Sequence, residues 1–464
     1  MDFWNNTLGG PTKIVAPMVD ASELPWRLLS RKYGAELCYT PMLHSAMFVK
    51  DAKYRKEALA TCEEDKPLII QFCGNDPKIM LEAALLAEDH CCAIDINLGC
   101  PQAIAKRGHY GAYLQDEWDL VSNIVSTLSK SCKVPITCKI RRFESVEKTI
   151  EYATLLEKSG CKVLTLHGRT REQKGPLTGL ADWLYVKEVK KAVKIPVISN
   201  GNIQTMQDIT NCMETTNCQG VMTAEGNLYN PYLFESTWPP CWEPALEYLD
   251  LVVKYPCPLS YIRGHLFKLF HHLLNLPENA KTRISLGAAK SVEQFFNISK
   301  ELRDKYIDYH NGVKLWDETN EPGTFNLILP PWLCQSYIRM PPDEHVKLVE
   351  EKVKEAQCAE KKRKYLDCEG NMISRKMMKK LRRIQRRPEK EAPSVCKKGL
   401  EKCGSCFNPQ GGKCNYKLCK KCCKDKCFLE NLDCPGHRIL VKTRREMAQF
   451  YQVERANTNK SVIK

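Results

Sequence analysis

The residue with the clearest chemical potential is Cys100, which lies in the stretch 97–101, Asn-Leu-Gly-Cys-Pro. The residues before it, 93–97, predict a short buried strand, so the thiol follows directly after a strand end. A basic, glycine-punctuated loop comes next, over residues 106–112. In α/β barrels the chemistry lies at the carboxyl ends of the strands. A cysteine at this position is therefore a candidate acid or nucleophile rather than a packing residue.

Two more polar residues stand at equivalent positions after later strands. Lys139 lies inside the apolar segment 136–140, and burial of its charge requires an anionic partner such as a reduced flavin. His167 ends the next apolar segment, and the following Gly168 would let a ligand approach closely. A structural histidine is the alternative for His167. Together with Cys100, these side chains predict one active site.

Further candidates follow the remaining strands, where backbone or amide groups would face a ligand. They are Pro17, Met18 and Val19 after the first strand, Gln71 in the third, Asn200, Gly201 and Asn202 after the seventh, and Ala224 and Glu225 after the eighth. The last two loops are the usual phosphate-binding loops of such barrels. Simple turns, and a glutamine bonded to the barrel wall, are the alternatives. Because no Gly-x-Gly-x-x-Gly follows a strand, we expect a planar, phosphate-bearing cofactor and only transient binding of a nicotinamide.

A second group of reactive residues lies near the end of the sequence. Nine of the 25 cysteines fall within residues 396–434. The spacings Cys403-x2-Cys406 and Cys419-x2-Cys422 allow two thiolates to face one tetrahedral ion. The segment has too few large apolar residues for a core, so metal would supply the folding energy. We predict two structural Zn²⁺ ions, with disulfides or a redox role as the alternative. The candidate ligands are Cys396, Cys403, Cys406, Cys414, Cys419, Cys422, Cys423, Cys427, Cys434 and His437.

That set of ten leaves one or two ligands over, and the spacing does not say which cysteines share an ion. Lysines surround the cluster, so it would present positive charge to phosphates. They are Lys397, Lys398, Lys402, Lys413, Lys417, Lys420, Lys421, Lys424 and Lys426.

The barrel candidates must be positioned by the elements of residues 13–235, where short apolar runs alternate with amphipathic stretches. Eight runs predict strands, at 14–16, 37–39, 68–72, 93–96, 136–140, 163–166, 197–200 and 220–223. Alternation of strands with helical patterns implies parallel strands and right-handed crossovers. Eight such units predict an α/β fold of the (β/α)8 TIM-barrel class, with a doubly wound open sheet as the alternative.

The pattern changes after residue 239, where we place the end of the barrel domain, 1–239. Residues 240–335 predict a small helical domain, with amphipathic helices over 242–254, 260–274 and 289–310. One helical face is either a solvated polar face or a nucleic-acid contact surface. It carries Arg263, His265, Lys268, His271 and His272.

A basic linker, 336–395, follows the helical domain. Its run 361–387 holds twelve basic residues against two acidic ones, which fits a solvated linker, a nuclear localisation signal or an RNA-binding arm. The cysteine-rich module, 396–437, and a basic tail, 438–464, complete the predicted organisation.

Composition sets the partners and the compartment. The net charge of +15 predicts an acidic partner, for which nucleic acid and anionic membrane are the usual candidates. The sequence contains no run of 18 apolar residues, so we expect no membrane span and no membrane partner. Its first residues lack the pattern of a signal peptide, and the other cysteines mostly stand singly. We therefore expect a protein of the cytosol, the nucleus or both, and take a monomer as the expectation.

In these motifs the sequence resembles the tRNA-dihydrouridine synthase family. The matching motifs are 16–18, 97–101 with 110–112, 139–141, 167–170 and 200–202, in order and spacing. The resemblance spans residues 13–335. Residues 37–42, the loop 224–226 and the cysteine-rich tail are most similar to the eukaryotic branch of the family that modifies positions 16 and 17 of the tRNA D-loop.

The resemblance implies an FMN enzyme that reduces the C5=C6 bond of uridine in tRNA, with NADPH or NADH as reductant. Hydride would pass from N5 of FMN to C6 of uridine, and Cys100 would give a proton to C5 as general acid. Lys139 would contact the isoalloxazine ring, and His167 would bind FMN and help to orient the uridine. The other barrel candidates would line the cofactor, the helical domain would bind tRNA, and the target base would leave its stack.

One departure from the family pattern concerns the last loop. Many members have Gly-Arg where this sequence has Ala224-Glu225. A glutamate cannot hold phosphate by charge, so a backbone N–H would serve there and another donor, for which Arg169 is a candidate, would balance the phosphate.

Two other hypotheses compete with the tRNA-modifying flavoenzyme. An FMN barrel acting on a free pyrimidine would not need the basic helical domain and tail. A catalytically inactive RNA-binding protein on a flavin-barrel scaffold would not need Cys100, Lys139 and His167.

Overall fold

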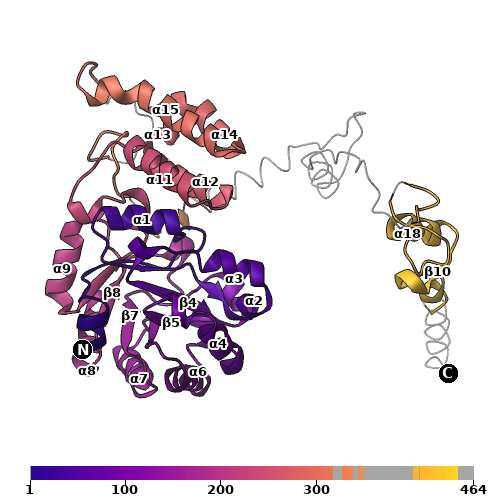
Figure 1. Ribbon diagram of the computed structural model, residues 1–464, viewed down its shortest axis with the longest axis horizontal. Coiled ribbons are helices and arrows are strands. Elements are labelled where there is room, and N and C mark those ends of the chain that lie inside the picture. The colour runs from indigo at the N-terminus through magenta and orange to yellow at the C-terminus, as the bar shows by residue number, and fades with distance from the viewer. Residues whose placement is uncertain are drawn as a thin grey trace, which may run out of the picture. The chain divides into compact units, whose positions relative to one another are not determined.

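The computed structural model describes residues 2–316, 327–337 and 401–447 apart from 407, together with positions 343, 344, 346, 347 and 349 (Figure 1). The chain divides into two compact units, Met1–Lys354 and Glu355–Lys464. The basic run 361–387, Cys396 and the last residues of the predicted tail lie outside the described residues, as does most of the predicted linker.

Eight parallel strands close a barrel in the first unit, which confirms the predicted TIM-barrel class and rules out the open sheet. Strand β1 pairs with both β2 and β9, and β2 also pairs with β4, so the ring is complete. The short β3 (Leu43–His44) adds to the end of β4. The barrel strands are β1 Lys13–Val15, β2 Leu37–Tyr39, β4 Leu68–Cys73, β5 Ala93–Leu98, β6 Ile136–Arg141, β7 Val163–His167, β8 Val197–Asn200 and β9 Gly220–Thr223.

Helices follow most of the strands and cover the outside of the barrel (Figure 1). Several begin at side-chain caps that the sequence supplies: Asp76 accepts from the N–H groups of Lys78 and Ile79, and Thr205 forms a reciprocal capping box with Asp208. The helices of the barrel are α1 Leu24–Lys32, α2 Ser45–Lys50, α3 Ala52–Ala58, α4 Pro77–Leu85, α5 Ala103–Gly108, α6 Trp118–Ser131, α7 Val146–Lys158, α8 Trp183–Ala192, α9 Met206–Thr216 and α10 Glu225–Tyr229. Short 3₁₀ helices lie at Glu63–Asp65, Glu88–His90, Gly111–Leu114, Gly175–Leu177 and Leu233–Glu235.

The strands are buried on both faces, and the two-residue period of a strand separates two apolar clusters. Ile14, Leu37 and Ile69 belong to the cluster inside the barrel, together with Trp4 from the N-terminal segment. Their neighbours along each strand belong to the cluster between the barrel and its helices. The same alternation continues toward the carboxyl ends of the strands, where the inward positions become polar.

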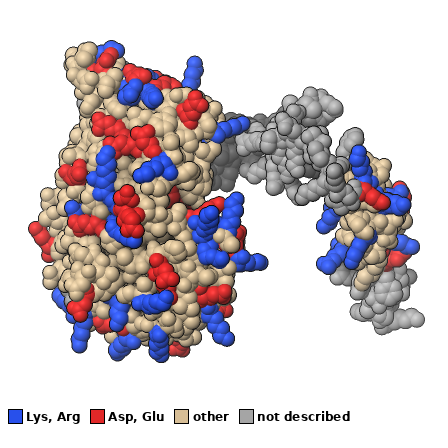
Figure 2. Space-filling view, in the orientation of Figure 1, with Lys and Arg blue, Asp and Glu red and all other residues tan. Residues whose placement is uncertain are grey.

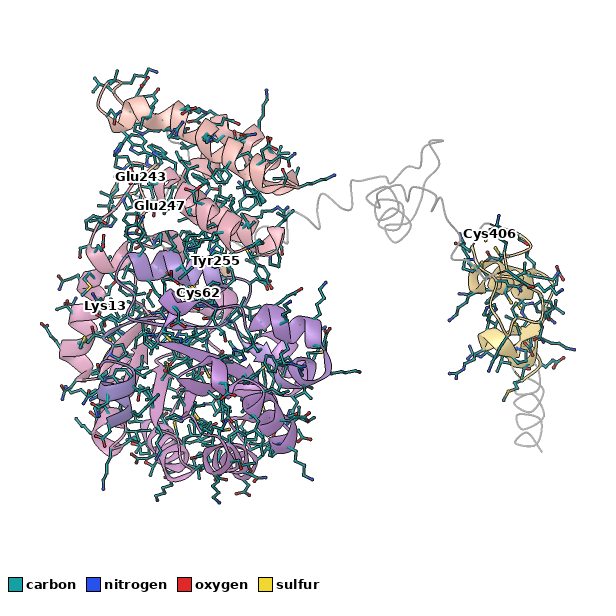
Figure 3. All side chains as sticks on the ribbon, viewed as in Figure 1. Lys13, Cys62, Glu243, Glu247, Tyr255 and Cys406 are labelled. Carbon is teal, nitrogen blue, oxygen red and sulfur yellow. The ribbon has the colours of Figure 1, made fainter. Side chains whose placement is uncertain are left out.

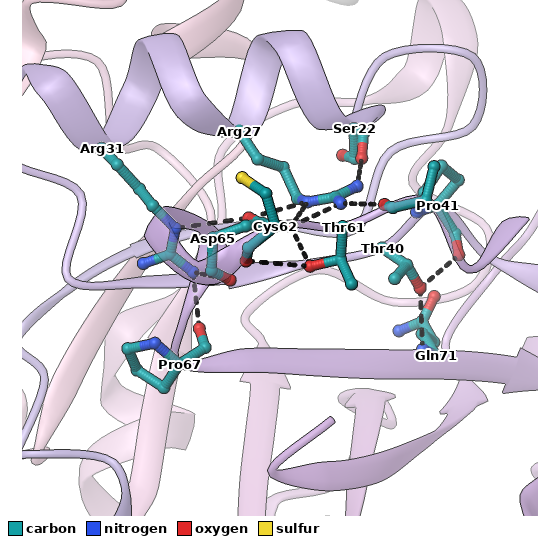
Figure 4. A network of polar contacts seen from close by, with 11 residues as sticks. Ser22, Arg27, Arg31, Thr40, Pro41, Thr61, Cys62, Asp65, Pro67 and Gln71 are labelled. Atoms are coloured by element: carbon teal, nitrogen blue, oxygen red, sulfur yellow. Dashed lines mark hydrogen bonds and ion pairs between the residues drawn. The ribbon is translucent and has the colours of Figure 1, made fainter. Parts of the chain in front are cut away.

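A buried carboxylate fixes α1 against the segment that leads into β4 (Figure 4). Asp65 is fully buried and receives hydrogen bonds from Arg27 Nε at 3.0 Å and Thr61 Oγ1 at 3.0 Å, with Arg31 Nε at 3.4 Å. On β4 itself, the N–H of Gln71 donates to Thr40 Oγ1 at 3.1 Å. These contacts set the position of β4 relative to its neighbours.

Helices without intervening strands make up the described part of the predicted helical domain. They are α11 Trp242–Lys254, α12 Leu259–Leu269, α13 His271–Asn275, a 3₁₀ turn Pro277–Asn279, α14 Ala280–Ala288 and α15 Val292–His310. The segment predicted as one helix over 260–274 is interrupted at Phe270. The last helix begins after Ser291, whose side chain accepts from the N–H of Gln294.

These helices pack directly on the barrel. Helix α11 contacts α1, and α12 contacts α10. Glu247 of α11, labelled in Figure 3, accepts a hydrogen bond from Tyr33 Oη at 2.7 Å and pairs with Lys32 Nζ at 3.0 Å. Apolar residues of α1 and α11 share one cluster, so the helical part and the barrel are joined by buried apolar contacts.

The predicted basic face of α12 and α13 differs from the expectation at His265. Its side chain is 1% exposed, stacks on Trp26 with ring centroids 3.9 Å apart and pairs with Glu23 Oε1 at 3.0 Å. His265 is therefore a core residue and cannot contact nucleic acid. Lys268 and His272 on the same face are half-buried.

The second unit is small and built around sulfur atoms. Its described elements are the helix α18 Lys420–Leu429, the antiparallel strands β10 Asp433–Cys434 and β11 Ile439–Leu440, and a 3₁₀ turn Pro435–His437. Its core cluster consists mainly of cysteines, with Leu418 and Val441. In both units, none of the described helices is long and apolar enough to cross a membrane.

Candidate active site and metal centre

Polar side chains occupy the inward positions at the carboxyl ends of neighbouring strands. Strand pairing places Asn97 beside Lys139 and Lys139 beside Thr165. One step further, Arg141 pairs with His167, and His167 with Asn200. The parallel register therefore brings predicted candidates from three strands, β6, β7 and β8, to one mouth of the barrel, as the sequence predicted.

The loop that carries Cys100 is held from both sides. Asn97 Oδ1 accepts hydrogen bonds from the N–H groups of Gly99 at 3.2 Å and Cys100 at 2.9 Å. The carbonyl of Cys100 accepts from the N–H of Ala112 at 3.1 Å. At Gly111 the backbone has φ +66°, and a Cβ there would stand 2.8 Å from the Cys100 carbonyl oxygen. Only glycine satisfies both conditions, so the loop keeps the half-buried thiol in a fixed position.

Lys139 is positioned by Asn200. Its Nζ donates to Asn200 Oδ1 at 2.8 Å, and Asn200 Nδ2 donates to the carbonyl of Met222 at 2.8 Å. Burial and the neighbouring Arg141 lower the pKa of Lys139 to about 8, while the nearby Asp95 carboxylate opposes that change. The ammonium group thus stands in a site where an added anion would stabilise it.

Arg141 connects the Cys100 loop to the loop that follows β7. Its Nε donates to the carbonyl of Gly99 at 2.9 Å, and one terminal nitrogen donates to the carbonyls of Thr170 at 2.7 Å and Gln173 at 3.0 Å. Burial, with a smaller contribution from Arg169, lowers the pKa of Arg141 to about 10. Arg141 was part of a predicted motif but not a predicted site residue.

Asp95 is a buried acid that was not among the predicted site residues. Its Oδ1 accepts from Thr137 Oγ1 at 2.6 Å, and its Oδ2 accepts from Gln71 Nε2 at 2.7 Å. Burial raises the pKa of Asp95 to about 6. Gln71 in turn accepts from Asn97 Nδ2 at 2.8 Å, so Gln71 lies in the barrel wall and supports the residue that holds Cys100. The sequence does carry a signal for this network, because Asp95 and Asn97 are polar residues at alternate positions of an otherwise apolar strand.

His167 is held as a neutral imidazole. Burial and the nearby Arg141, Lys139 and Arg169 lower the pKa of His167 well below its usual range. A terminal nitrogen of Arg169 lies 3.1 Å from His167 Nε2. Because arginine has only donors, Nε2 is the acceptor and the ring proton is on Nδ1.

The loop of residues 168–182 is fastened by Arg169 and Asn202. Arg169 donates to the carbonyls of Thr178 and Gly179 and to Asn202 Oδ1 at 2.8 Å. Asn202 also exchanges two hydrogen bonds with the backbone of Ala181. The amide of Asn202, predicted to face the cofactor, therefore supports this loop. At Gly201, with φ +111°, a Cβ would come within 2.9 Å of the His167 ring.

The first and last loops complete the mouth. Pro17 and Met18 are half-buried, and Val19 is 59% exposed. The N–H of Met18 donates to Ser22 Oγ at 2.8 Å. After β9, Ala224 precedes Glu225, the first residue of α10.

Lys268 of α12 approaches this last loop from the helical part of the unit. Burial lowers the pKa of Lys268, and the carboxylate of Glu225 opposes that shift. A lysine from another element therefore stands within electrostatic reach of the loop that carries Glu225.

The donors at the mouth suit an anion. Lys139, Arg141 and Arg169 are cationic, and their mutual repulsion contributes to the lowered pKa values of Lys139, Arg141 and His167. The buried acid beside them, Asp95, has a raised pKa and cannot balance them fully. A phosphate-bearing, reducible planar cofactor would supply the missing negative charge.

The cysteine-rich unit brings eight of the predicted metal ligands into two groups of four. Within each group the ligand atoms lie within 4.8 Å of one another. The first group is Cys403, Cys406, Cys419 and Cys422, and the second is Cys414, Cys423, Cys434 and His437. Cys427 is buried with its Sγ 4.0 Å from that of Cys423, and belongs to neither group. All cysteines among the described residues are free thiols, so none forms the disulfide that was the alternative prediction.

Basic side chains project from this unit (Figure 2). Among its described residues seven lysines are exposed, while Lys426 is half-buried and pairs with Glu430 at 2.8 Å. The exposed lysines are Lys402, Lys413, Lys417, Lys420, Lys421, Lys424 and Lys442. Lys397 and Lys398 lie outside the described residues.

Comparison with known proteins gives matches over nearly the whole chain. The family model Dihydrouridine synthase (Dus) matches residues 14–304. The chain is 50% identical to the tRNA-dihydrouridine(16/17) synthase (NAD(P)(+))-like protein of Mus musculus, over 96% of this chain and 91% of the relative. It is 40% identical to the tRNA-dihydrouridine(16/17) synthase (NAD(P)(+)) of Saccharomyces cerevisiae, over 72% of this chain and 84% of that relative. A tRNA-dihydrouridine(20a/20b) synthase (NAD(P)+)-like protein of Homo sapiens is 33% identical, over 58% of this chain and 85% of that relative.

Proposed function

Because the chain belongs to the dihydrouridine synthase family, we propose that it is a tRNA-dihydrouridine synthase that uses FMN and NADPH or NADH. Its substrate is uridine at position 16, position 17 or both in the tRNA D-loop, the positions in the names of its relatives. The observation that carries the proposal is the convergence of Cys100, Lys139 and His167 at one mouth of the barrel. An inactive RNA-binding scaffold would have no need of that convergence.

The donor set at the mouth fits FMN. Lys139 is the residue that would hold negative charge on the reduced ring, and its ammonium is aimed by Asn200. Arg169 and Lys268 are the cations that would balance the phosphate near the last loop, where Glu225 cannot. The backbone of residues 17–19 and 224–225 would line the cofactor. When bound, FMN supplies the hydride that C6 of the uridine receives.

Cys100 supplies the proton that the product needs at C5. The thiol is a general acid that loses its proton to the base as the C5=C6 bond is reduced. Asn97 and Gly111 hold its loop in place, so the proton donor is positioned before the substrate arrives. Neutral His167 keeps Nδ1–H available to donate a hydrogen bond to the uridine or the cofactor.

The remaining regions serve the macromolecular substrate. The net charge of +15 and the exposed lysines of the cysteine-rich unit suit a polyanion such as tRNA. The helices over residues 240–335 would contact tRNA by faces other than the one that contains His265. The target uridine must be unstacked to reach the mouth of the barrel, as for other enzymes that act on bases.

The cysteine-rich unit binds zinc, and its role is structural. Groups of four thiolates or three thiolates with one imidazole match the ligand sets of structural zinc sites. A four-ligand site leaves no open position for chemistry. We further propose that the protein acts as a monomer, without a membrane partner, in the cytosol, the nucleus or both.

The test is dihydrouridine formation in tRNA from cells that lack the modification. We expect the purified protein with FMN and NADPH to reduce uridine at position 16, position 17 or both, mapped by mass spectrometry of nuclease fragments. A Cys132→Ala variant should behave like the wild type, since Cys132 follows α6 away from the mouth. FMN-loaded protein that binds tRNA but leaves every uridine intact would favour the inactive scaffold.

A further inference from the structure

The two groups of metal ligands are interleaved along the chain. Cys414 of the second group lies between the two Cys-x2-Cys pairs of the first, 403–406 and 419–422. Conversely, the pair 419–422 lies between Cys414 and Cys434 of the second group. Cys422 and Cys423 are adjacent in sequence and belong to different groups. Neither group can be removed from the chain without cutting the other.

We propose that residues 403–437 form a cross-braced module with two Zn²⁺ sites, one of four thiolates and one of three thiolates and His437, in which Cys427 is not a ligand. The inference deepens the proposed function, since it rests on the proposal that the cluster binds zinc. Each ion binds after its cysteines release their protons, up to four at the first site and three at the second.

The exclusion of Cys427 follows from the geometry and not from its chemistry. Its thiol is buried next to Cys423, yet it is absent from both sets of mutually close ligand atoms. His437 completes the second set instead, with Nδ1 3.9 Å from Cys434 Sγ. Cys427 therefore packs as an apolar residue in the small core of the module.

His437 reaches the second site because Gly411 leaves room for its ring. A Cβ at Gly411 would lie 2.2 Å from His437 Nε2 and 2.9 Å from Cε1. The backbone of Gly411 is fixed by hydrogen bonds to Leu418 and Cys414, so a methyl group there would displace the imidazole. Gly412, the next residue, has no atom within 4 Å of the place that a Cβ would take.

Interleaving makes the two sites depend on each other. The segment that carries Cys414 is closed into a loop by the first site, and the second site holds the helix start that carries Cys419 and Cys422. Sulfur atoms make up most of the module's core, so metal–sulfur bonds replace apolar packing as the source of stability. Loss of either ion therefore weakens the hold on the other.

The test measures zinc in the purified full-length protein and in single variants, before and after exposure to a competing chelator. We expect two zinc ions per chain in the wild type and in Cys427→Ser. We expect His437→Ala and Gly411→Ala to lose zinc from the second site, and Gly412→Ala to keep both ions. Cobalt substitution separates the sites, because its visible spectrum differs between four-sulfur and three-sulfur coordination.

The dependence of each site on the other is measured by how well one site keeps its ion after the other site has been mutated. After His437→Ala, the cobalt in the four-sulfur site should be lost to the chelator faster than in the wild type, and Cys406→Ser should have the same effect on the three-sulfur site. Unchanged retention at the remaining site would overturn the cross-brace. Loss of one zinc in Cys427→Ser, with retention of two in His437→Ala, would overturn the ligand assignment. A wild-type chain that binds neither zinc nor cobalt would refute the zinc proposal itself and leave the proposed synthase activity untouched.

Discussion

The barrel mouth and the cysteine-rich module solve the same problem, the placement of reactive side chains, in two different ways. At the mouth, strand register places Lys139, His167 and Asn200, and a large apolar core between the barrel and its helices supplies the stability. In the module, the reactive side chains are themselves the core. Cysteine therefore has two different settings in one chain: a single half-buried thiol at the mouth of the barrel, and a cluster of sulfurs turned inward. The position of a cysteine relative to backbone elements decides its use.

The largest effect is expected at Cys100. Replacement by alanine removes the proton donor, and the rate of dihydrouridine formation should fall by roughly 10²- to 10⁴-fold. Binding of tRNA and FMN should stay within about twofold, because backbone groups hold the loop. Single-turnover kinetics and a tRNA binding assay measure both quantities. An unchanged rate would show that Cys100 is a packing cysteine like those in the core, and that the barrel mouth contains no reactive thiol.

Lys139→Met tests whether charge at the mouth serves the cofactor. It removes the ammonium that Asn200 positions, and a charge-assisted hydrogen bond of this kind contributes about 1.5–3 kcal/mol. We expect reduction of FMN by NADPH to slow by roughly 10- to 100-fold. Stopped-flow absorbance under anaerobic conditions follows the reaction. Lys130→Met, an exchange on the outer helix α6, is the matched control and should leave the rate unchanged.

Removal of zinc tests whether the cysteine-rich module contributes to tRNA binding. A chelator should unfold the cysteine-rich module and lower tRNA affinity by roughly tenfold at moderate salt, because its lysines no longer form one surface. Deletion of residues 396–464 should do the same, and the salt dependence of binding should become shallower. The FMN spectrum and the melting temperature of the barrel should not change. Equal tRNA affinity at every salt concentration would show that the module does not contact RNA.

A fourth effect depends on pH and is small below pH 8. The pKa of Lys139 is about 8 in the cofactor-free protein, below its usual 10.5, so the lysine loses its proton on folding between these values. The affinity for FMN should therefore fall as pH rises through 8, by up to about tenfold per pH unit. Over the same range the cofactor-free barrel should become more stable, since only the unfolded chain is protonated there. Lys139→Arg should abolish both trends, as titration and thermal melts can show.

The sequence predicted the fold, and it predicted that Cys100, Lys139 and His167 lie at one mouth of the barrel, because the signals for both are local. Each barrel strand is a short apolar run, and Cys100, Lys139 and His167 stand at the ends of such runs. The parallel register then brings them together without further information. The Cys-x2-Cys spacing is equally local, because two thiolates on one turn can face the same ion.

What the sequence could not supply depends on contacts between distant residues. His265 lies on a periodic helix face, and only its pairing with Glu23, 242 positions away, shows that it is buried. Asn202 follows a strand as predicted, but its amide holds Ala181 of another loop. The division of the cysteines between two sites, with Cys427 left out, follows from the folding of the segment and not from spacing.

Reduction of the flavin and reduction of uridine can be followed in one experiment. The protein is loaded with FMN, reduced with NADPH without oxygen, freed of nicotinamide and mixed with tRNA that lacks dihydrouridine. We predict that the flavin is reoxidised as one dihydrouridine forms per flavin, in the D-loop at position 16 or 17, and that Cys100→Ala slows both signals together. Flavin that stays reduced in the presence of bound tRNA would contradict the account.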